Sequence, residues 1–231
     1  QIEELMAFSY HKRKASVVVL TGPFVAAPAD GNVDDQMMYD DQFDALTEKV
    51  SAIVEACKGM KVVVIPSLKD LAAEYVFPQP MFDVDFDNEA ILGLGNPSSF
   101  LVNNDITVGI CTNDILQHIA GTLVEVQADQ RLARIPRVAR EVIRSRSYYP
   151  LVPAHPDAQV DYTLCHHCEF QSTTPDILIL PSFLPAFAQK VEGTLVINPG
   201  LIRKHNFAEV TIGAGQGLVA DRATVEIFKL T

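Results

Sequence analysis

The sequence predicts an α/β protein in which a mixed sheet, or two packed sheets, carries helices on the outside. Val17–Leu20 and Lys61–Ile65 are short apolar runs rich in β-branched residues, which is typical of strands. Apolar residues between them recur at helical spacing, so we expect a β-α-β unit with a parallel strand pair and a right-handed crossover. A third run, Ile177–Leu180, is enclosed by two prolines and indicates a strand buried on both faces.

The composition is that of a globular protein with a sizeable core. The chain has 231 residues, of which 48% are hydrophobic and 20% charged, and this length favours one large domain, with two small domains as the alternative. The net charge of -11 opposes nucleic-acid binding as the main function, because affinity for nucleic acids comes largely from neutralising phosphates. A partner protein is the better expectation. The four cysteines are typical of reduced, intracellular thiols.

In the first half of the chain, turn residues separate the predicted elements. Gly22-Pro23 ends the first strand, and residues 26–41 predict an exposed loop whose acidic residues favour solvation over a metal site. The helix that follows carries its apolar face on Phe43, Leu46, Val50, Ile53 and Val54, and Gly59 closes it. Residues 67–74 predict a short helix, and residues 76–87 predict a loop.

In the second half, Asn103-Asn104-Asp105 joins two strands, Phe100–Val102 and Ile106–Ile110, as a hairpin. Thr112 or Asn113 is expected to cap a short helix that ends at Ile119. A second helix should begin after Pro136 and run to residue 143, followed by a long ordered loop over residues 145–174. The last predicted strands are 194–197, 208–212 and 225–228.

The carboxyl ends of the strands are the places where an α/β protein usually binds its ligands. Here these positions are Thr21–Phe24, Pro66–Leu68 and Pro181–Leu184. None of the three segments contains a carboxylate, an imidazole or a thiol. We therefore expect no catalytic, cofactor-binding or metal-binding residues at the strand ends.

Cys165-His166-His167-Cys168 is the pattern most similar to a metal site. A single CxxC pair supplies two thiolates, whereas tetrahedral zinc needs four ligands, so ordinary loop residues are the favoured interpretation and zinc the alternative. Cys57 and Cys111 are isolated in the sequence. The other histidines, His11, His118, His155 and His205, show no pair at ligand spacing.

Five arginines recur every three or four residues, opposite the apolar face of the second predicted helix. They form either a solvated helix face, which is favoured, or a basic stripe for phosphate or an acidic partner; they are Arg131, Arg134, Arg137, Arg140 and Arg144. Asn198-Pro199-Gly200 and Gly213–Gly217 are interpreted as turns, and Asp176 as a residue that orders the loop before its strand. A phosphate cradle at Gly213–Gly217 would need a helix directly after it, and we expect a strand.

Several segments together resemble the B subunits of eukaryotic replicative DNA polymerases, the alpha-primase member in particular. They occur in the family's order and extend from about residue 17 to the C-terminus. Arg146–Leu151 is similar to the alpha member more than to delta or epsilon. The matching segments are Leu20–Phe24, Val64–Asp70, Tyr75–Pro80, Arg146–Leu151, Thr174–Ser182 and Ile197–Gly200.

The resemblance implies a calcineurin-like phosphoesterase fold, a sandwich of two mixed sheets flanked by helices, whose dinuclear metal site is lost. Active relatives carry Asp-x-His, Gly-Asn-His and Gly-His-x-His motifs at positions that correspond here to Thr21–Pro23, Pro66–Leu68 and Pro181–Leu184, and none of these retains a ligand. Residues 17–231 would form this domain and residues 1–16 would lead into it. The family's oligonucleotide-binding domain would lie upstream of Gln1.

The function implied is that of a non-catalytic scaffold in the nucleus, without a cofactor. It would bind the C-terminal domain of the polymerase alpha catalytic subunit, reach primase and other replication factors indirectly, and bind nucleic acid weakly. The alternatives are an active metal-dependent phosphodiesterase and the B subunit of polymerase delta or epsilon. Tyr148 and Tyr149 would anchor the long loop to the core or contact the partner, and the anchor is favoured.

Overall fold

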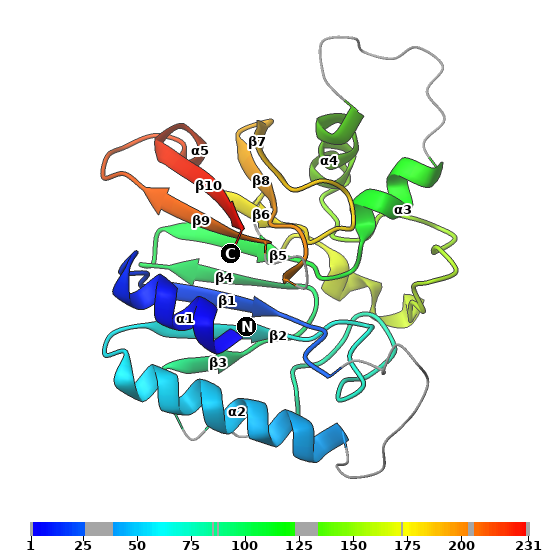
Figure 1. Cartoon of the computed structure of the whole chain (residues 1–231). Helices are drawn as coiled ribbons and strands as arrows, with labels where there is room; N and C mark the ends of the chain where they lie inside the picture. The colour runs from blue at the N-terminus through cyan, green and yellow to red at the C-terminus, as the bar shows by residue number, and fades with distance from the viewer. Residues whose placement is uncertain are drawn as a thin grey trace. The chain divides into compact units, whose positions relative to one another are not determined.

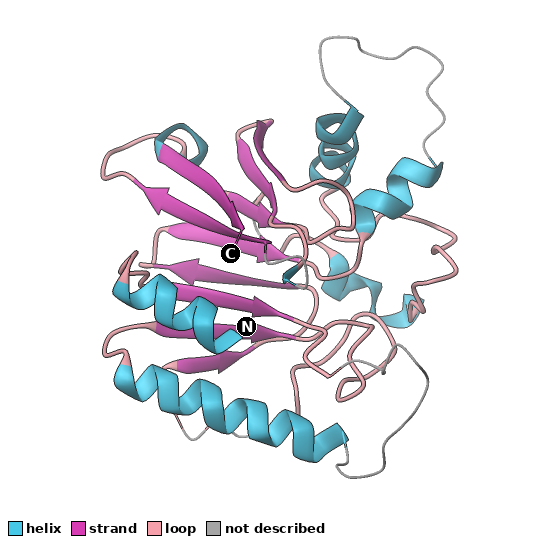
Figure 2. Cartoon of the chain, in the orientation of Figure 1, coloured by secondary structure: helices cyan, strands magenta, loops and turns pink. Residues whose placement is uncertain are grey.

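The computed structural model describes residues 2–25, 39–84, 86, 88–122, 134–171, 173–202 and 206–229. The chain is mixed α/β, as predicted (Figure 2). It divides into two compact units, Gln1–Asn96 and Pro97–Thr231. No helix among the described residues combines the length and the apolar character needed to span a membrane.

The first unit contains a parallel sheet. Its strands are β1 (Val17–Thr21), β2 (Lys61–Ile65) and β3 (Ile91–Gly93), paired in the order β1-β2-β3. Helix α2 (Tyr39–Ala56) lies between β1 and β2 in the sequence, so the predicted β-α-β unit is confirmed, and α1 (Ile2–His11) packs next to α2 (Figure 1).

The core of the first unit follows the predicted helical and strand patterns. β2 buries four consecutive residues, Val62 to Ile65, as expected for a central strand of a parallel sheet. The apolar face of α2 buries Phe43, Val50 and Val54, and the Phe43 ring stacks on Phe82. Gly59 has φ +88, so the predicted glycine that closes this helix adopts the left-handed conformation.

Residues 67–74 form turns rather than the short helix that the sequence suggested. The carboxylate of Asp70 binds backbone N–H groups of another loop, which competes with a helical path for this segment. Gln79 and Asn96 are both buried and are hydrogen-bonded to each other through their side chains (2.8 Å) and their backbones. The strand β3, which lies between them in the sequence, was not predicted.

The second unit contains a mixed five-stranded sheet in the order β4-β5-β6-β8-β7. β5, β6 and β8 are parallel, and the two outer strands pair antiparallel with their neighbours. A separate antiparallel pair is formed by β9 and β10. The strands are β4 (Ser98–Val102), β5 (Ile106–Ile110), β6 (Ile177–Ile179), β7 (Phe187–Val191), β8 (Thr194–Asn198), β9 (Asn206–Ile212) and β10 (Ala223–Lys229).

The described strands thus pair as three sheets, where two mixed sheets were expected, and β7 was not predicted. The predicted hairpin between β4 and β5 is confirmed, with φ 54 at Asn103 and φ 58 at Asn104, as a tight turn with two left-handed residues requires.

The helices of the second unit are α3 (Ile115–Thr122), α4 (Arg134–Ser145), the short α5 (Val219–Arg222) and a 3₁₀ helix, η1 (Tyr162–Cys168). Asp114 caps α3, because its carboxylate accepts a hydrogen bond from Gln117 N (3.1 Å). The predicted cap residues were Thr112 or Asn113. α4 begins before Pro136, because the first turn of a helix needs no backbone donor at that position. The expectation that Pro136 precedes the helix was wrong.

The long loop between α4 and β6 is ordered as predicted, although η1 within it was not foreseen. Gly213–Gly217 lies in a turn, but the next element is α5 and not a strand. α5 contributes Val219 to a core that also buries Ile106, Val108, Ile177, Leu195 and Ile197.

Candidate functional site: the carboxyl ends of the strands

Asp70 holds together the two loops that follow β1 and β2 in the first unit. Its side chain is fully buried and its carboxylate accepts from Phe24 N (2.7 Å), Val25 N (3.1 Å) and Ala72 N (3.4 Å). Burial raises the pKa of Asp70 above its ordinary value, and the three N–H donors partly offset that rise. The carboxylate is therefore used for loop structure.

Gly22 marks how closely these loops approach each other. A Cβ at this position would lie 2.8 Å from the Asp70 carboxylate and 3.0 Å from the backbone nitrogen of Ser67. The first contact is shorter than real Cβ atoms show and the second is tighter than most of them, so a side chain at position 22 requires a shift of the neighbouring groups. The end of β1 has no room there for a ligand-bearing side chain.

Asn198 plays the corresponding part in the second unit, at the end of β8. It is fully buried, and its Oδ1 accepts from Ser182 N and Gly200 N, both at 3.0 Å. Its Nδ2 donates to the carbonyls of Leu184 (3.1 Å) and Pro185 (3.2 Å). Both donor hydrogens and both acceptor positions of this amide are therefore used in hydrogen bonds to the loops after β6 and β8.

The end of β5 completes this arrangement. Asp114 accepts from Phe183 N (2.8 Å) through Oδ2, which fastens the loop after β6 to the start of α3. Burial raises the pKa of the neighbouring Cys111 thiol far above its ordinary value, so the thiol stays protonated. Buried Asn113 has an Nδ2 group without a hydrogen-bond partner among the described residues. These groups provide no nucleophile or general base.

The strand-end residues that the sequence reasoning missed are therefore structural ones: Asp70, Asp114 and Asn198. In the sequence, each of them is a polar residue within a few positions of a strand end. Such a position is equally typical of a metal-binding side chain and of a side chain that holds a loop by hydrogen bonds. The hydrogen bonds above distinguish the two uses, since each of these side chains is engaged with backbone groups.

Comparison with known proteins places the chain in a family. The family model that describes the B subunit of DNA polymerase alpha/epsilon matches residues 1–189. The chain belongs to this B-subunit family. The resemblance found in the sequence motifs is confirmed.

Among curated relatives, the chain is 28% identical over 200 residues to the B subunit of DNA polymerase alpha from Mus musculus, covering 84% of this chain and 33% of the relative. It is 32% identical over 195 residues to the protein of that name in Drosophila melanogaster, covering 82% of the chain and 30% of the relative. It is 29% identical over 229 residues to the protein of that name in Schizosaccharomyces pombe, covering 87% of the chain and 37% of the relative. The chain spans about a third of the length of these relatives.

The family motif Arg146–Leu151 contains two tyrosines that anchor the loop after α4. Tyr148 and Tyr149 are both buried. The Tyr148 hydroxyl lies 2.5 Å from Ser99 Oγ, and its ring packs edge-on against Phe170. Burial raises the pKa of Tyr148 to about 12. Gly109 on β5 is required here, because a Cβ would collide with the Tyr148 hydroxyl. The predicted anchoring role is supported.

The Cys165–Cys168 motif of this family member lies on η1. Cys165 is exposed and Cys168 is buried, and no disulfide joins the four cysteines. Burial, followed by the charges of Cys165 and Glu169, raises the pKa of Cys168 to about 12. Among the described residues, these cysteines join no group of three metal-ligating side chains.

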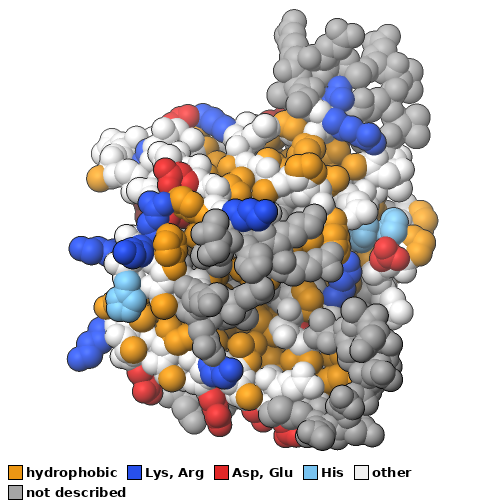
Figure 3. Space-filling view, viewed as in Figure 1, with side chains coloured by type: hydrophobic (Ala, Val, Ile, Leu, Met, Phe, Trp, Pro, Cys, Tyr) orange, Lys and Arg blue, Asp and Glu red, His pale blue; other side chains and the backbone are white. Residues whose placement is uncertain are grey.

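The arginines of α4 make contacts within their own unit. Arg144 forms an ion pair with Glu192 (2.7 Å) next to β7, and Arg134 donates to the carbonyl of Ala120 in α3 (2.8 Å). Arg140 lies 4.0 Å from Glu141, and Arg131 falls outside the described residues. On the face that Figure 3 shows, basic side chains are dispersed among apolar and acidic ones.

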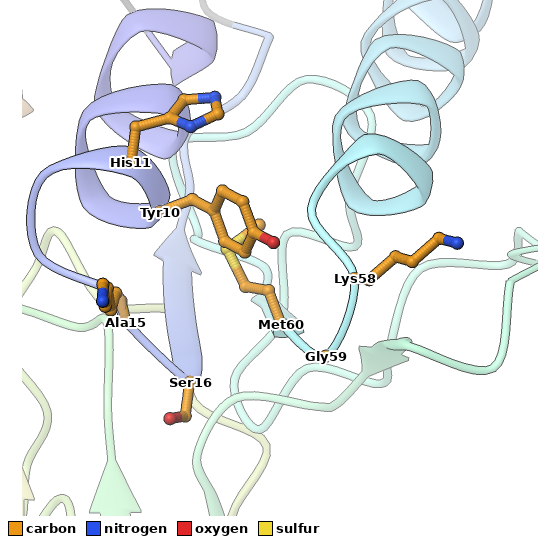
Figure 4. A pocket seen from close by; sticks show the side chains of 8 residues that line it. Tyr10, His11, Ala15, Ser16, Lys58, Gly59 and Met60 are labelled. Atoms are coloured by element: carbon orange, nitrogen blue, oxygen red, sulfur yellow. The ribbon is translucent and has the colours of Figure 1, made fainter.

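A pocket of about 410 Å³ lies in the first unit, beside the loops that precede β1 and β2. Tyr10, Ser16, Lys58 and Met60 are among its lining residues. The side chains of Tyr10 and Met60 overlap in the view of Figure 4, whereas the Lys58 ammonium points away from both. Because the polar groups do not converge on one point, this pocket offers no evident ligand site.

The structure brings His118 and His155 together, although the sequence showed no histidine pair. Their rings stack with centroids 4.1 Å apart, and Asp157 lies beside them. Sequence spacing could not show this pair, because the two histidines come from α3 and from the loop after α4, which only the fold places side by side. Asp176 orders its surroundings as expected, accepting from Thr107 N (2.9 Å).

Proposed function

We propose that this chain is the phosphoesterase-like domain of a polymerase alpha B subunit and that it acts as a non-catalytic scaffold. It binds the C-terminal domain of the catalytic subunit and so connects that subunit to primase and other replication factors in the nucleus. Residues 17–231 form the domain, and residues 1–16 lead into it. The names of the curated relatives support the alpha assignment.

The observation that carries the proposal is that the strand-end segments lack metal-binding side chains and that hydrogen bonds to backbone groups hold their loops. Two-metal hydrolysis needs side chains that hold two ions about 4 Å apart. The positions expected to supply them hold Thr21–Pro23, Pro66–Leu68 and Pro181–Leu184. Three nearby polar side chains, those of Asp70, Asp114 and Asn198, are engaged with backbone groups. Loops fixed in this way suit a rigid binding platform.

The net charge of -11 also favours a protein partner over direct nucleic-acid binding. A permanent contact between subunits buries on the order of 2,000 Å² or more and has an apolar centre. Large apolar side chains are exposed in both units, among them Tyr75, Met81 and Leu92 in the first and Val152, Tyr162 and Leu164 in the second.

The test is co-purification with the C-terminal domain of the polymerase alpha catalytic subunit, with the corresponding domains of delta and epsilon as matched controls. We expect a stable complex at micromolar concentration with the alpha domain alone and without nucleotide. Binding to delta or epsilon in preference to alpha would change the assignment, and failure of a folded chain to bind any of the three would refute the scaffold.

A further inference from the structure

Two histidines and an aspartate of the second unit lie close enough to share one ion. His118, His155 and Asp157 each offer one ligand atom, and these three atoms lie within 4.8 Å of one another. We propose that they form a zinc site that fastens the loop after α4 to helix α3. This inference is independent of the scaffold function and of the strand ends.

His118 is the fixed member of the group. It is buried on α3, whose neighbouring residues Ile115, Leu116 and Ile119 are also buried. Its Nδ1 lies 3.2 Å from the hydroxyl of Tyr149. A metal-ligating histidine commonly uses its second ring nitrogen in such a hydrogen bond, which fixes the ring orientation.

Tyr149 also holds the loop that carries the other two residues. Its hydroxyl accepts from His155 N at 3.1 Å, so one buried phenol is bound to both segments of the group. Asp157 follows two residues later, and its Oδ2 lies 3.8 Å from His155 Nδ1. A turn closed by Ala158 N and the carbonyl of His155 (2.9 Å) keeps these two side chains near each other.

The distances suit zinc after a small contraction. Zinc bonds to nitrogen and oxygen of about 2.0–2.2 Å place tetrahedral ligand atoms roughly 3.4 Å apart. The pair His155–Asp157 at 3.8 Å is close to this value, and no pair in the group exceeds 4.8 Å.

One imidazole must turn when the ion binds. The two rings are nearly parallel, with an angle of 9° between them, and an ion cannot lie in two parallel planes at once. His155 lies on a loop and its side chain is 34% exposed, whereas His118 is buried, so His155 is the ring that turns. In the metal-free chain His155 Nδ1 accepts a hydrogen bond from Asp157 N (3.2 Å). Zinc binding would therefore replace both the ring stacking and this hydrogen bond by coordination.

The ligand chemistry favours a transition metal, and zinc is the one we propose. Two imidazoles and one carboxylate suit zinc, whereas calcium and magnesium prefer oxygen ligands throughout. Three protein ligands leave a fourth position for water, and the acidic character of the chain favours cations in general.

The test is a calorimetric zinc titration of the whole chain after metal has been stripped from it, with cobalt as a spectroscopic substitute. We expect saturable 1:1 binding and a higher melting temperature with zinc. His155→Ala and Asp157→Asn change partly exposed side chains, so the fold should persist while affinity falls at least about tenfold. The matched control His166→Ala, an exposed histidine on η1, should retain the affinity.

Absence of saturable binding at micromolar zinc would overturn the proposal. So would binding that survives His155→Ala and is lost in Cys165→Ser, because the ion would then belong to η1. The variants His155→Ala and Asp157→Asn should still co-purify with the catalytic subunit's C-terminal domain, so this test and that of the scaffold fail separately.

Discussion

Asp70 shows at the scale of one residue how the strand ends are held. Its carboxylate accepts from three backbone N–H groups in a fully buried position. Asp70→Ala leaves those donors unsatisfied and should lower the free energy of unfolding by about 1–3 kcal/mol. Urea denaturation measures this. Asp83→Ala, at an exposed carboxylate, is the control and should stay within about 0.5 kcal/mol of the wild type.

The same residue predicts a pH dependence. Burial raises the pKa of Asp70 above its ordinary value of 3.8, so the folded chain holds this proton more tightly than the unfolded chain. Its contribution to stability is then largest below the ordinary pKa and decreases as pH rises to the folded value. The difference in unfolding free energy between wild type and Asp70→Ala should shrink over that interval. A difference that grows with pH would contradict the assignment.

Gly22 makes the close approach of the loops testable. Gly22→Ala places a Cβ within 3.0 Å of the Asp70 carboxylate and the Ser67 backbone, and overpacking of this kind costs about 1–3 kcal/mol. The control is Gly121→Ala, on α3, where a Cβ meets nothing within 4 Å. It should be neutral or stabilising, because alanine favours helices. Equal effects of the two substitutions would show that the strand end has room for a side chain.

At the scale of the element, the loop between α4 and β6 depends on its two buried tyrosines. The double substitution Tyr148→Ala, Tyr149→Ala removes the contacts to Ser99, Phe170 and His118, and should cost roughly 3 kcal/mol or more, as truncation of buried aromatics does. The melting temperature should fall. Val152→Ala, in the same loop but 81% exposed, is the control. Unchanged melting together with lost partner affinity would instead assign the tyrosines to the interface.

The elements that local patterns specify could be predicted from the sequence. The strand pair β1 and β2, the helix between them and the Asn103-Asn104 hairpin follow from apolar periodicity and turn residues. The turns at 67–74 could not, since Asp70 binds the loop that follows β1, across many intervening residues. β7, with two exposed polar residues at its centre, gave no strand signal.

For the candidate site, the sequence could predict only that the strand-end segments lack metal-binding and catalytic side chains. The sequence could not show that Asp70, Asp114 and Asn198 accept hydrogen bonds from backbone groups of other loops, because residue spacing does not reveal such contacts. His118 and His155 likewise meet because one helix and one loop pack together.

At the scale of the whole molecule, the acidic net charge predicts weak binding to DNA. The arginines of α4 have partners within their unit, including Glu192, so they add little to a phosphate-binding surface. Fluorescence anisotropy with single- and double-stranded oligonucleotides at about 150 mM salt should give dissociation constants weaker than micromolar. Submicromolar affinity with a steep salt dependence would show that the basic helix face outweighs the net charge.

Whether the strand ends are structural or catalytic is tested most directly by phosphodiesterase assays of the purified chain with added manganese, iron or zinc. Because the expected ligand positions at Thr21–Pro23, Pro66–Leu68 and Pro181–Leu184 offer no carboxylate or imidazole, we predict no turnover of model phosphodiesters above the rate with Asp70→Ala or with chelator present. Hydrolysis that chelator abolishes, with about two metal ions bound per chain, would contradict the assignment and identify an active phosphoesterase.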